Sequence, residues 1–189
     1  MKKIAVFASG SGTNAQNLAQ YFSKGNKARI AAIYCNNPSA GVIKRAENLN
    51  IPLILFNRED LFNNNKVLQS LIDQEIDLIV LAGFLWLMPK NIIQSFQGRI
   101  VNIHPALLPL YGGKGMYGSK VHESVIRDRQ RVSGITIHII DEEYDKGQTL
   151  FQATCDITDD DTAETLAGKI HELEYMYFPQ VIDEYLDKI

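Results

Sequence analysis

The chain has 189 residues, of which 46% are hydrophobic and 22% are charged, and its formal net charge is −3. This length favours one domain that buries roughly 70% of its unfolded surface, and the composition is ordinary for a soluble globular protein. The acidic balance and the lack of any Lys/Arg run argue against a nucleic-acid surface, while a local basic pocket for a phosphate stays compatible with them. No segment reaches the roughly 20 apolar residues that span a membrane, and glycines interrupt the N-terminal apolar run before it attains the length of a signal peptide.

The two cysteines, Cys35 and Cys155, are isolated in the sequence. Their positions give neither a paired metal-ligand spacing nor a disulfide framework, so we expect no metal site. This cysteine usage is typical of a reducing compartment, and we expect the protein in the cytoplasm.

Short apolar runs alternate with helical patterns through the first half of the chain. Strands are expected at 3–8, 29–35, 52–56, 77–82 and 99–104. Helices are expected at 14–22, 40–49, 58–74 and 89–96. Because the strands are apolar on both faces, they predict a mostly parallel, doubly wound α/β sheet with a Rossmann-like N-terminal half. In the helix at 58–74, the predicted inner stripe is Leu61, Leu68, Leu71 and Ile72.

The second half of the chain has a different pattern of polar and apolar residues. After a helix at 119–127, the segments 133–140 and 149–157 alternate between polar and apolar residues, and a short polar connection joins them. This pattern predicts an antiparallel C-terminal hairpin at one end of the sheet.

A long helix is expected at 162–186 and ends the chain. Asp161 or Thr162 is its predicted N-cap, because short polar side chains accept a hydrogen bond from the first free backbone N–H groups. Pro179 should break or kink this helix, since proline has no N–H group to donate.

Two polar residues stand side by side at the end of the expected strand 99–104. Val101 and Ile103 point to one face, and Asn102 and His104 point to the other. The Asn102 amide can donate two hydrogen bonds, and His104 can act as an acid or a base near neutral pH. This arrangement predicts a site, although a strand end whose polar groups only meet solvent would look the same.

A glycine-rich turn, Gly10-x-Gly12-x-x-Ala15, lies between the first strand and the first helix. This layout is typical of a dinucleotide site, but such a site needs an acidic residue at the end of the second strand, where Asn36 and Asn37 stand. The turn is better suited to a phosphate monoester, held by backbone N–H groups and the positive helix end. A turn that needs glycine only for backbone reasons is the alternative.

The acidic segment 141–147 connects the two strands of the hairpin. It is either a solvated turn or the source of a carboxylate that sets the protonation of His104. His138 lies within a strand and is predicted to be a hydrogen-bonded structural residue. His122 and His171 fall on helices, and their pattern predicts that both are exposed.

Four segments carry a family resemblance. They are Ser-Gly-Ser-Gly-Thr-Asn at 9–14, Leu-Ala-Gly-Phe at 81–84, Asn-Ile-His-Pro-Ala-Leu-Leu-Pro at 102–109, and Gly-Ile-Thr-Ile-His at 134–138 with Asp145-Lys146-Gly147 after it. In order and over essentially the whole chain, they resemble the folate-dependent phosphoribosylglycinamide formyltransferases. The resemblance implies one formyltransferase domain over 1–189, with a ribonucleotide-binding half at 1–100 and a catalytic, folate-binding half at 101–189.

The resemblance also implies the substrates, which are 10-formyltetrahydrofolate as formyl donor and glycinamide ribonucleotide as acceptor, with no metal ion. The implied catalytic residues are Asn102, His104 and Asp145. The implied ribonucleotide-binding residues are Ser11, Gly12, Thr13 and Asn14 for the phosphate and Glu174 for the ribose. The implied folate-binding residues are Leu85, Trp86, Leu87, Met88, Ile140, Asp141 and Arg58. We expect no nucleic-acid or membrane partner, and a monomer or weak homodimer.

Three features depart from the family pattern. Trp86 stands where many members carry Arg, and His171 stands where Gln or Lys is common near the ribonucleotide. The glycine-rich loop 112–118 is longer than usual, and it is either a lid over the folate or a surface loop.

Rival functions remain open at this point. A formyltetrahydrofolate hydrolase would use the same site with water as acceptor, but would be expected to carry an extra N-terminal domain. A methionyl-tRNA formyltransferase would be expected to carry a basic C-terminal domain. A nucleotide-dependent oxidoreductase would bind NAD(P) at the glycine turn, and a silent binding module would keep the pocket without turnover.

Overall fold

The computed structural model describes residues 1–141 and 147–189. Strands and helices alternate along the first half, as the periodicity predicts. The strands are β1 (Lys2–Ala8), β2 (Ala28–Cys35), β3 (Leu53–Leu55), β4 (Leu78–Leu81), β5 (Ile100–His104), β6 (Val132–Ile139) and β7 (Thr149–Asp156). The helices are α1 (Thr13–Phe22), α2 (Val42–Asn48), α3 (Arg58–Phe62), α4 (Lys66–Asp73), α5 (Lys90–Ser95), α6 (Ser119–Arg127) and α7 (Ala163–Tyr185), with a 3₁₀ turn at Leu186–Lys188.

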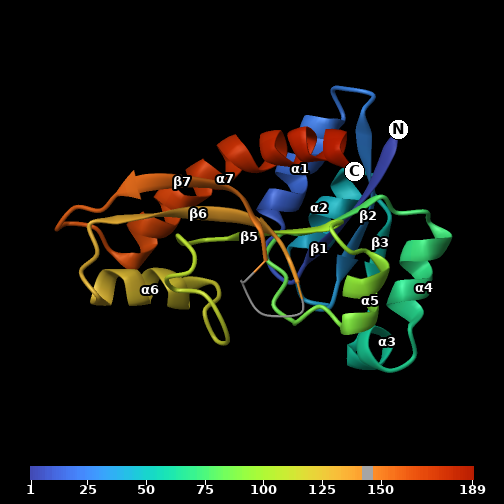
Figure 1. Cartoon of the computed structure of the whole chain (residues 1–189), viewed down its shortest axis with the longest axis horizontal. Helices are drawn as coiled ribbons and strands as arrows, with labels where there is room; N and C mark the ends of the chain where they lie inside the picture. The colour runs from blue at the N-terminus through green and yellow to red at the C-terminus, as the bar shows by residue number, and fades with distance from the viewer. Residues whose placement is uncertain (142–146) are drawn as a thin grey trace.

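The strands form one mixed sheet in the order β3-β2-β1-β4-β5-β6-β7 (Figure 1). Pairing is parallel from β3 to β5, and it is antiparallel between β5 and β6 and between β6 and β7. The predicted doubly wound sheet with an antiparallel end is therefore confirmed. The chain builds outward from β1 to β3 and then returns to place β4 on the other side of β1. The carboxyl ends of β1 and β4 thus form the switch point where open α/β sheets bind ligands.

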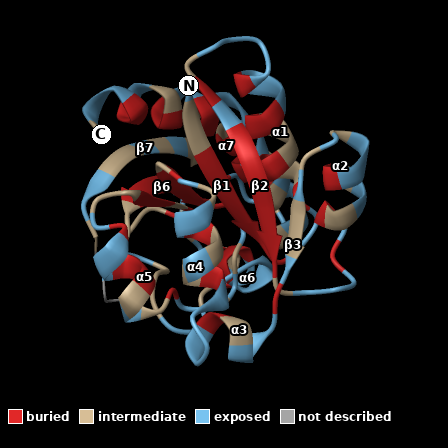
Figure 2. Cartoon of the chain, turned by 90° about the vertical axis from the view of Figure 1, so that its right-hand side faces the viewer, coloured by how far each residue is buried: buried red, intermediate tan, exposed pale blue. Residues whose placement is uncertain are grey.

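Both faces of the sheet are covered by helices. Along β1, Ile4 and Val6 join a core cluster with α1, α2 and α7, whereas Ala5 and Phe7 join a second cluster with α3, α4 and α5. Figure 2 shows β1 and β2 almost entirely buried between these two layers. Because the side chains on both faces of these strands are buried, the central strands are continuous apolar runs in the sequence.

The prediction of a single helix at 58–74 is wrong. The segment forms two helices, α3 and α4, and Asn65 between them has a left-handed backbone with φ of 59°. Three consecutive asparagines lie at the break, and the Asn64 side chain accepts a hydrogen bond from the backbone of Lys66 at 3.1 Å. Such local bonds compete with the helix ladder. Ile72 on α4 is 49% exposed, so it does not belong to the predicted inner stripe.

Of the break or kink predicted at Pro179, the break is wrong, because α7 runs unbroken through it. A proline at this position leaves the carbonyl of Tyr175, four residues earlier, without its usual donor. The side chain of Asn17 on α1 donates to that carbonyl at 2.9 Å. The neighbouring helix therefore supplies the bond that proline cannot make. At its start, α7 is capped by Thr162, as predicted.

Candidate active site

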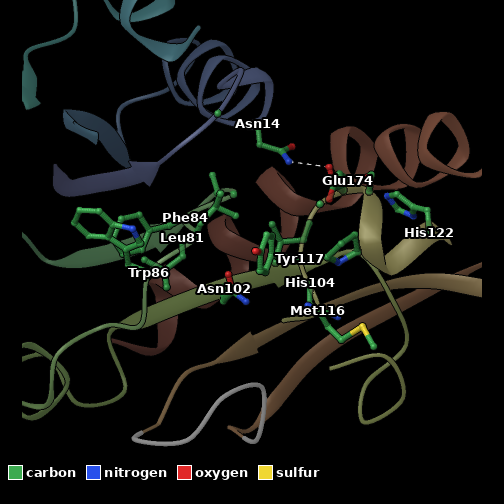
Figure 3. A pocket seen from close by; sticks show the side chains of 18 of the residues that line it. Asn14, Leu81, Phe84, Trp86, Asn102, His104, Met116, Tyr117, His122 and Glu174 are labelled. Atoms are coloured by element: carbon green, nitrogen blue, oxygen red, sulfur yellow. Dashed lines mark hydrogen bonds between the residues drawn. The ribbon is translucent and has the colours of Figure 1, made fainter. Parts of the chain in front are cut away.

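A cavity of about 980 Å³ opens at the carboxyl edge of the sheet. Its walls come from the turn after β1, the segment after β4, the end of β5, and helices α6 and α7 (Figure 3). Of the predicted site residues that the structure describes, all but Arg58 line this cavity. Asp145 lies outside the described residues. The cavity also includes Gly113–Gly118, so the loop is a wall of the pocket, and its interpretation as a surface loop alone is wrong.

The glycine turn has the backbone geometry that its sequence requires. Gly12 has a φ of 77°, and a Cβ on it would lie 2.3 Å from Val42 Cγ2. Gly12 is therefore needed both for its left-handed backbone and for the close approach of α2. The first turn of α1 carries no acidic residue, so its free N–H groups and positive dipole end suit an anion.

The turn is also tied to the segment after β4. Ser9 Oγ accepts from the backbone of Leu85 at 3.1 Å, and Ser9 N donates to the carbonyl of Gly83 at 3.0 Å. Two walls of the pocket are thus held in fixed relation at the switch point.

Asn102 and His104 both point from β5 into the cavity. Asn102 Nδ2 donates to His138 Nε2 at 3.1 Å, while His138 Nδ1 lies 3.2 Å from the carbonyl of Ile139. A carbonyl only accepts, so Nδ1 carries the proton and Nε2 is the acceptor. His138 is therefore hydrogen-bonded, as predicted, but its partner is the site residue Asn102. The pairing of β5 with β6 places the two opposite each other, which could not be read from either strand alone.

His104 is 4% exposed, and its Nε2 donates to the carbonyl of Tyr111 at 2.8 Å. The segment between these residues is anchored to β6 and β7. Thr136 Oγ1 donates to Ala106 O at 2.7 Å and accepts from Leu108 N and from Gln152 Nε2, each at 2.9 Å. These bonds hold the loop that brings the Tyr111 carbonyl back to the imidazole.

A second polar network lies on the helix side of the cavity. Glu174 Oε2 accepts from Asn14 Nδ2 at 2.8 Å, and His171 Nδ1 lies 3.0 Å from the same oxygen. The hydrogen bond to Glu174 raises the pKa of His171. His171 is exposed, as predicted, and its ring lies at the rim of the pocket.

The prediction that His122 is exposed is wrong. It is 5% exposed and lines the cavity from the buried face of α6. Burial lowers its pKa, and the neighbouring charge of His171 adds to this effect. The helical pattern of Val121, His122 and Val125 contained the signal, since these residues share one face, but the packing of α7 against that face was not visible in it.

A cluster of aromatic rings adjoins the cavity at Trp86 and Phe84. Trp86 lies on the pocket wall, and the guanidinium of Arg58 sits 4.8 Å from its ring centroid and 5.8 Å from that of Phe62. Arg58 thus reaches the pocket edge through Trp86, although it does not line the cavity. Flat rings beside a fixed cation suit a ligand with an aromatic body and a carboxylate.

Among the described residues, no cluster of His, Cys, Asp and Glu has a metal-binding arrangement, and no helix is both long and apolar enough to cross a bilayer.

This fold, with its polar β5 end beside the glycine turn, is that of a one-carbon transferase of the formyl transferase class. The family model described as formyl transferase matches residues 2–182, and the chain belongs to that family.

Similar proteins of this family have names that specify one kind of formyl transferase. A phosphoribosylglycinamide formyltransferase of Bacillus subtilis is 38% identical over 191 residues, which cover 98% of this chain and 95% of that protein. A chloroplastic phosphoribosylglycinamide formyltransferase of Vigna unguiculata is also 38% identical, and there the match spans 60% of the longer protein. The crystal structure of glycinamide ribonucleotide transformylase 1 from Geobacillus kaustophilus is similar with a TM-score of 0.90 at 35% identity, covering 98% of this chain and 99% of that one.

Proposed function

We propose that this chain transfers the formyl group of 10-formyltetrahydrofolate to the amine of glycinamide ribonucleotide, a reaction of de novo purine synthesis. The observation that carries the proposal is that one cavity joins the glycine turn, Glu174 and the Asn102–His104 pair. A phosphorylated sugar that carries an amine needs an anion site, a polar sugar site and an acyl-transfer site in that order.

Each substrate has a proposed place in the cavity. The phosphate binds the turn formed by Ser11, Gly12, Thr13 and Asn14, and the ribose lies at Glu174. The folate lies against Leu85, Trp86, Leu87, Met88, Ile140 and Asp141. Arg58, held over Trp86, meets the carboxylate tail of the folate. In this proposal the stack supplies the cation that the family resemblance implies at the position of Trp86.

The reaction is an acyl transfer between two nitrogen atoms. The amine nitrogen attacks the formyl carbon, and the carbonyl oxygen becomes an oxyanion. The Asn102 amide has a second N–H besides the one bound to His138, and that donor stabilises the oxyanion. His104 adds positive charge beside this oxygen once the oxyanion replaces the Tyr111 carbonyl as its partner. The bond to N10 of the folate then breaks, and the proton lost by the amine passes to N10.

Asp145 is proposed to favour the charged form of His104 and to assist this proton transfer. We expect Asp145→Asn to lower kcat far more than it changes the KM of either substrate, because its role is in the transition state. Steady-state kinetics with each substrate varied in turn measure this. A change confined to KM would contradict the assignment.

The decisive experiment follows folate absorbance and product formation with purified protein and 10-formyltetrahydrofolate, with and without glycinamide ribonucleotide. The proposal expects turnover only when the ribonucleotide is present, with one formylated product per folate consumed. Equal turnover without the amine would support a hydrolase instead. Tight binding of NAD(P) in calorimetry, without formyl transfer, would support an oxidoreductase.

A further inference from the structure

The glycine-rich loop between β5 and α6 carries an aromatic side chain that the core of the protein does not use. Tyr117 is 44% exposed, and it lines the cavity. Figure 3 shows its side chain in the pocket to which Asn102 and His104 also belong. An aromatic ring buries a large apolar area once it is covered, so a ring left open on a pocket wall favours contact with a bound molecule.

Both ends of this loop are fixed close to His104. At its start, the carbonyl of Tyr111 accepts a hydrogen bond from His104 Nε2 at 2.8 Å. At its end, α6 carries His122, whose pKa is lowered chiefly by burial and, among smaller effects, by the charge of His104. The loop 112–118 therefore crosses the cavity beside the imidazole, on a path that brings Tyr117 to the reacting groups.

The ring of Tyr117 has a defined place on this loop. Gly113 and Gly115 have φ values of 89° and 91°, and the backbone of Met116 donates to the carbonyl of Gly113 at 3.1 Å, which closes a turn. Tyr117 follows this turn directly. From the first turn of α6, Lys120 Nζ lies 4.8 Å from the centroid of the ring and donates to its hydroxyl at 3.3 Å. The loop and the helix thus hold the ring from two sides.

The proposed transfer has a competing reaction at the same site. Asn102 and His104 would also stabilise the oxyanion that forms when water attacks the formyl carbon. In that reaction the water oxygen bonds to the carbon and the bond to N10 breaks. One proton of the water passes to N10, the other passes to solvent, and formate is released. Because water is the solvent, transfer to the amine requires that the site keep water away from the formyl carbon.

We infer that the ring of Tyr117 covers the formyl group of the bound donor and excludes water from it, so that this residue determines the choice of the amine over water as acceptor. β5 supplies the donors on one side of the formyl group, the ribonucleotide occupies the side of the glycine turn, and the ring closes the side of the loop. The inference rests on the proposed function and adds to it a residue that sets acceptor specificity.

The test measures how the formyl group divides between two products. The full chain receives both substrates at saturating concentration, and formate and formylated ribonucleotide are counted, with the formate of an enzyme-free sample subtracted. For the unmodified protein, formate should be a minor product. In Tyr117→Ala the ratio of formate to formylated ribonucleotide should rise roughly tenfold, which corresponds to about 1.4 kcal/mol in the difference between the two barriers. In Tyr117→Phe, which keeps the ring, the ratio should stay as in the unmodified protein.

Two further variants serve as controls. Leu110→Ala should leave the ratio unchanged, because Leu110 is an exposed apolar residue on the same connection that does not line the cavity. The double variant Asn102→Ala Tyr117→Ala should lose the extra formate, since that formate arises at the transfer site. A ratio between two products does not depend on the fraction of folded protein, so partial misfolding of a variant does not imitate the result.

Three results would overturn the inference and leave the proposed function intact. Tyr117→Ala would leave the ratio unchanged, Tyr117→Phe would raise it as much as Tyr117→Ala does, or the extra formate would persist without Asn102. The second result would mean that the hydroxyl, and not the cover by the ring, controls access of water. If the unmodified protein forms formate at the same rate with and without the ribonucleotide, and no formylated product, the proposed function fails and the inference fails with it.

Discussion

Among contacts between single residues, the one between Asn102 and His138 bears most directly on the proposed reaction. The amide can direct one N–H to the reacting oxygen only if its rotation is fixed, and His138 fixes it by accepting the other N–H. His138 does not line the cavity, so its proposed role is to position Asn102.

We expect His138→Phe to reduce kcat by about 10- to 100-fold with little change in KM, which is less than the loss of an oxyanion donor itself. In an Asn102→Ala background the same substitution should have almost no further effect, because the group that it orients is gone. A double-mutant cycle on kcat measures this coupling. Additive effects of the two substitutions would show that His138 serves only the stability of the sheet.

The hydrogen bond between His171 and Glu174 predicts a dependence of stability on pH. Folding raises the pKa of His171, chiefly through this bond. The stabilisation is therefore complete at pH below the ordinary histidine value of about 6.5, and it is lost as the pH rises through the raised value. Urea unfolding across this range should show the loss in the unmodified protein and a flatter profile in His171→Gln. If the free energy of unfolding of His171→Gln depended on pH as steeply as that of the unmodified protein, this prediction would be contradicted.

At the scale of elements, α7 depends on α1 for one of its own backbone bonds. We expect Asn17→Leu to lower the free energy of unfolding by about 1 kcal/mol, because the Tyr175 carbonyl then loses its donor. In a Pro179→Ala background, a backbone N–H can supply that donor, and the effect of Asn17→Leu should shrink. Chemical denaturation of the four proteins gives the coupling energy. Equal effects in both backgrounds would show that Asn17 acts in another way.

The pairing of β6 with β7 requires a glycine at position 134. A Cβ on Gly134 would lie 1.9 Å from the carbonyl oxygen of Ala153 and 2.8 Å from Leu107 Cδ2. Glycine is needed there because the neighbouring strand and the loop after His104 both pack onto its backbone. The strand that carries Thr136 and His138 behind the site thus depends on this close approach.

At the scale of the whole molecule, the cavity is assembled from both halves of the chain. The glycine turn belongs to the first half, whereas β5, α6 and α7 belong to the second. A bound ribonucleotide would contact both, so it should stabilise the folded protein as a unit. At a concentration 100 times its Kd it should add about 2.7 kcal/mol to the free energy of unfolding.

Thermal melts with increasing glycinamide ribonucleotide measure this stabilisation. Glu174→Ala removes the carboxylate shared by Asn14 and His171, and the same concentrations should then shift the melting temperature much less. An equal shift in both proteins would place the ribonucleotide elsewhere.

The sequence by itself determined the features that depend on local geometry. The alternation in β5 put Asn102 and His104 on one face, the glycine turn opened α1 without an acidic residue, and the N-cap of α7 was limited to Asp161 or Thr162, of which the structure shows Thr162. The order of apolar runs and helical patterns also gave the doubly wound sheet with its antiparallel end. Each of these follows from backbone periodicity or from a side chain that bonds within a few residues of itself.

Only the tertiary structure decided which of these groups meet. The burial of His122 depends on α7 covering α6, and the unbroken passage of α7 through Pro179 depends on Asn17, 158 positions from its acceptor. The partner of Asn102 depends on the register of β6. A periodic pattern shows which face of an element is apolar, but it does not show what packs against that face, and burial, hydrogen-bond partners and pKa values all follow from that packing.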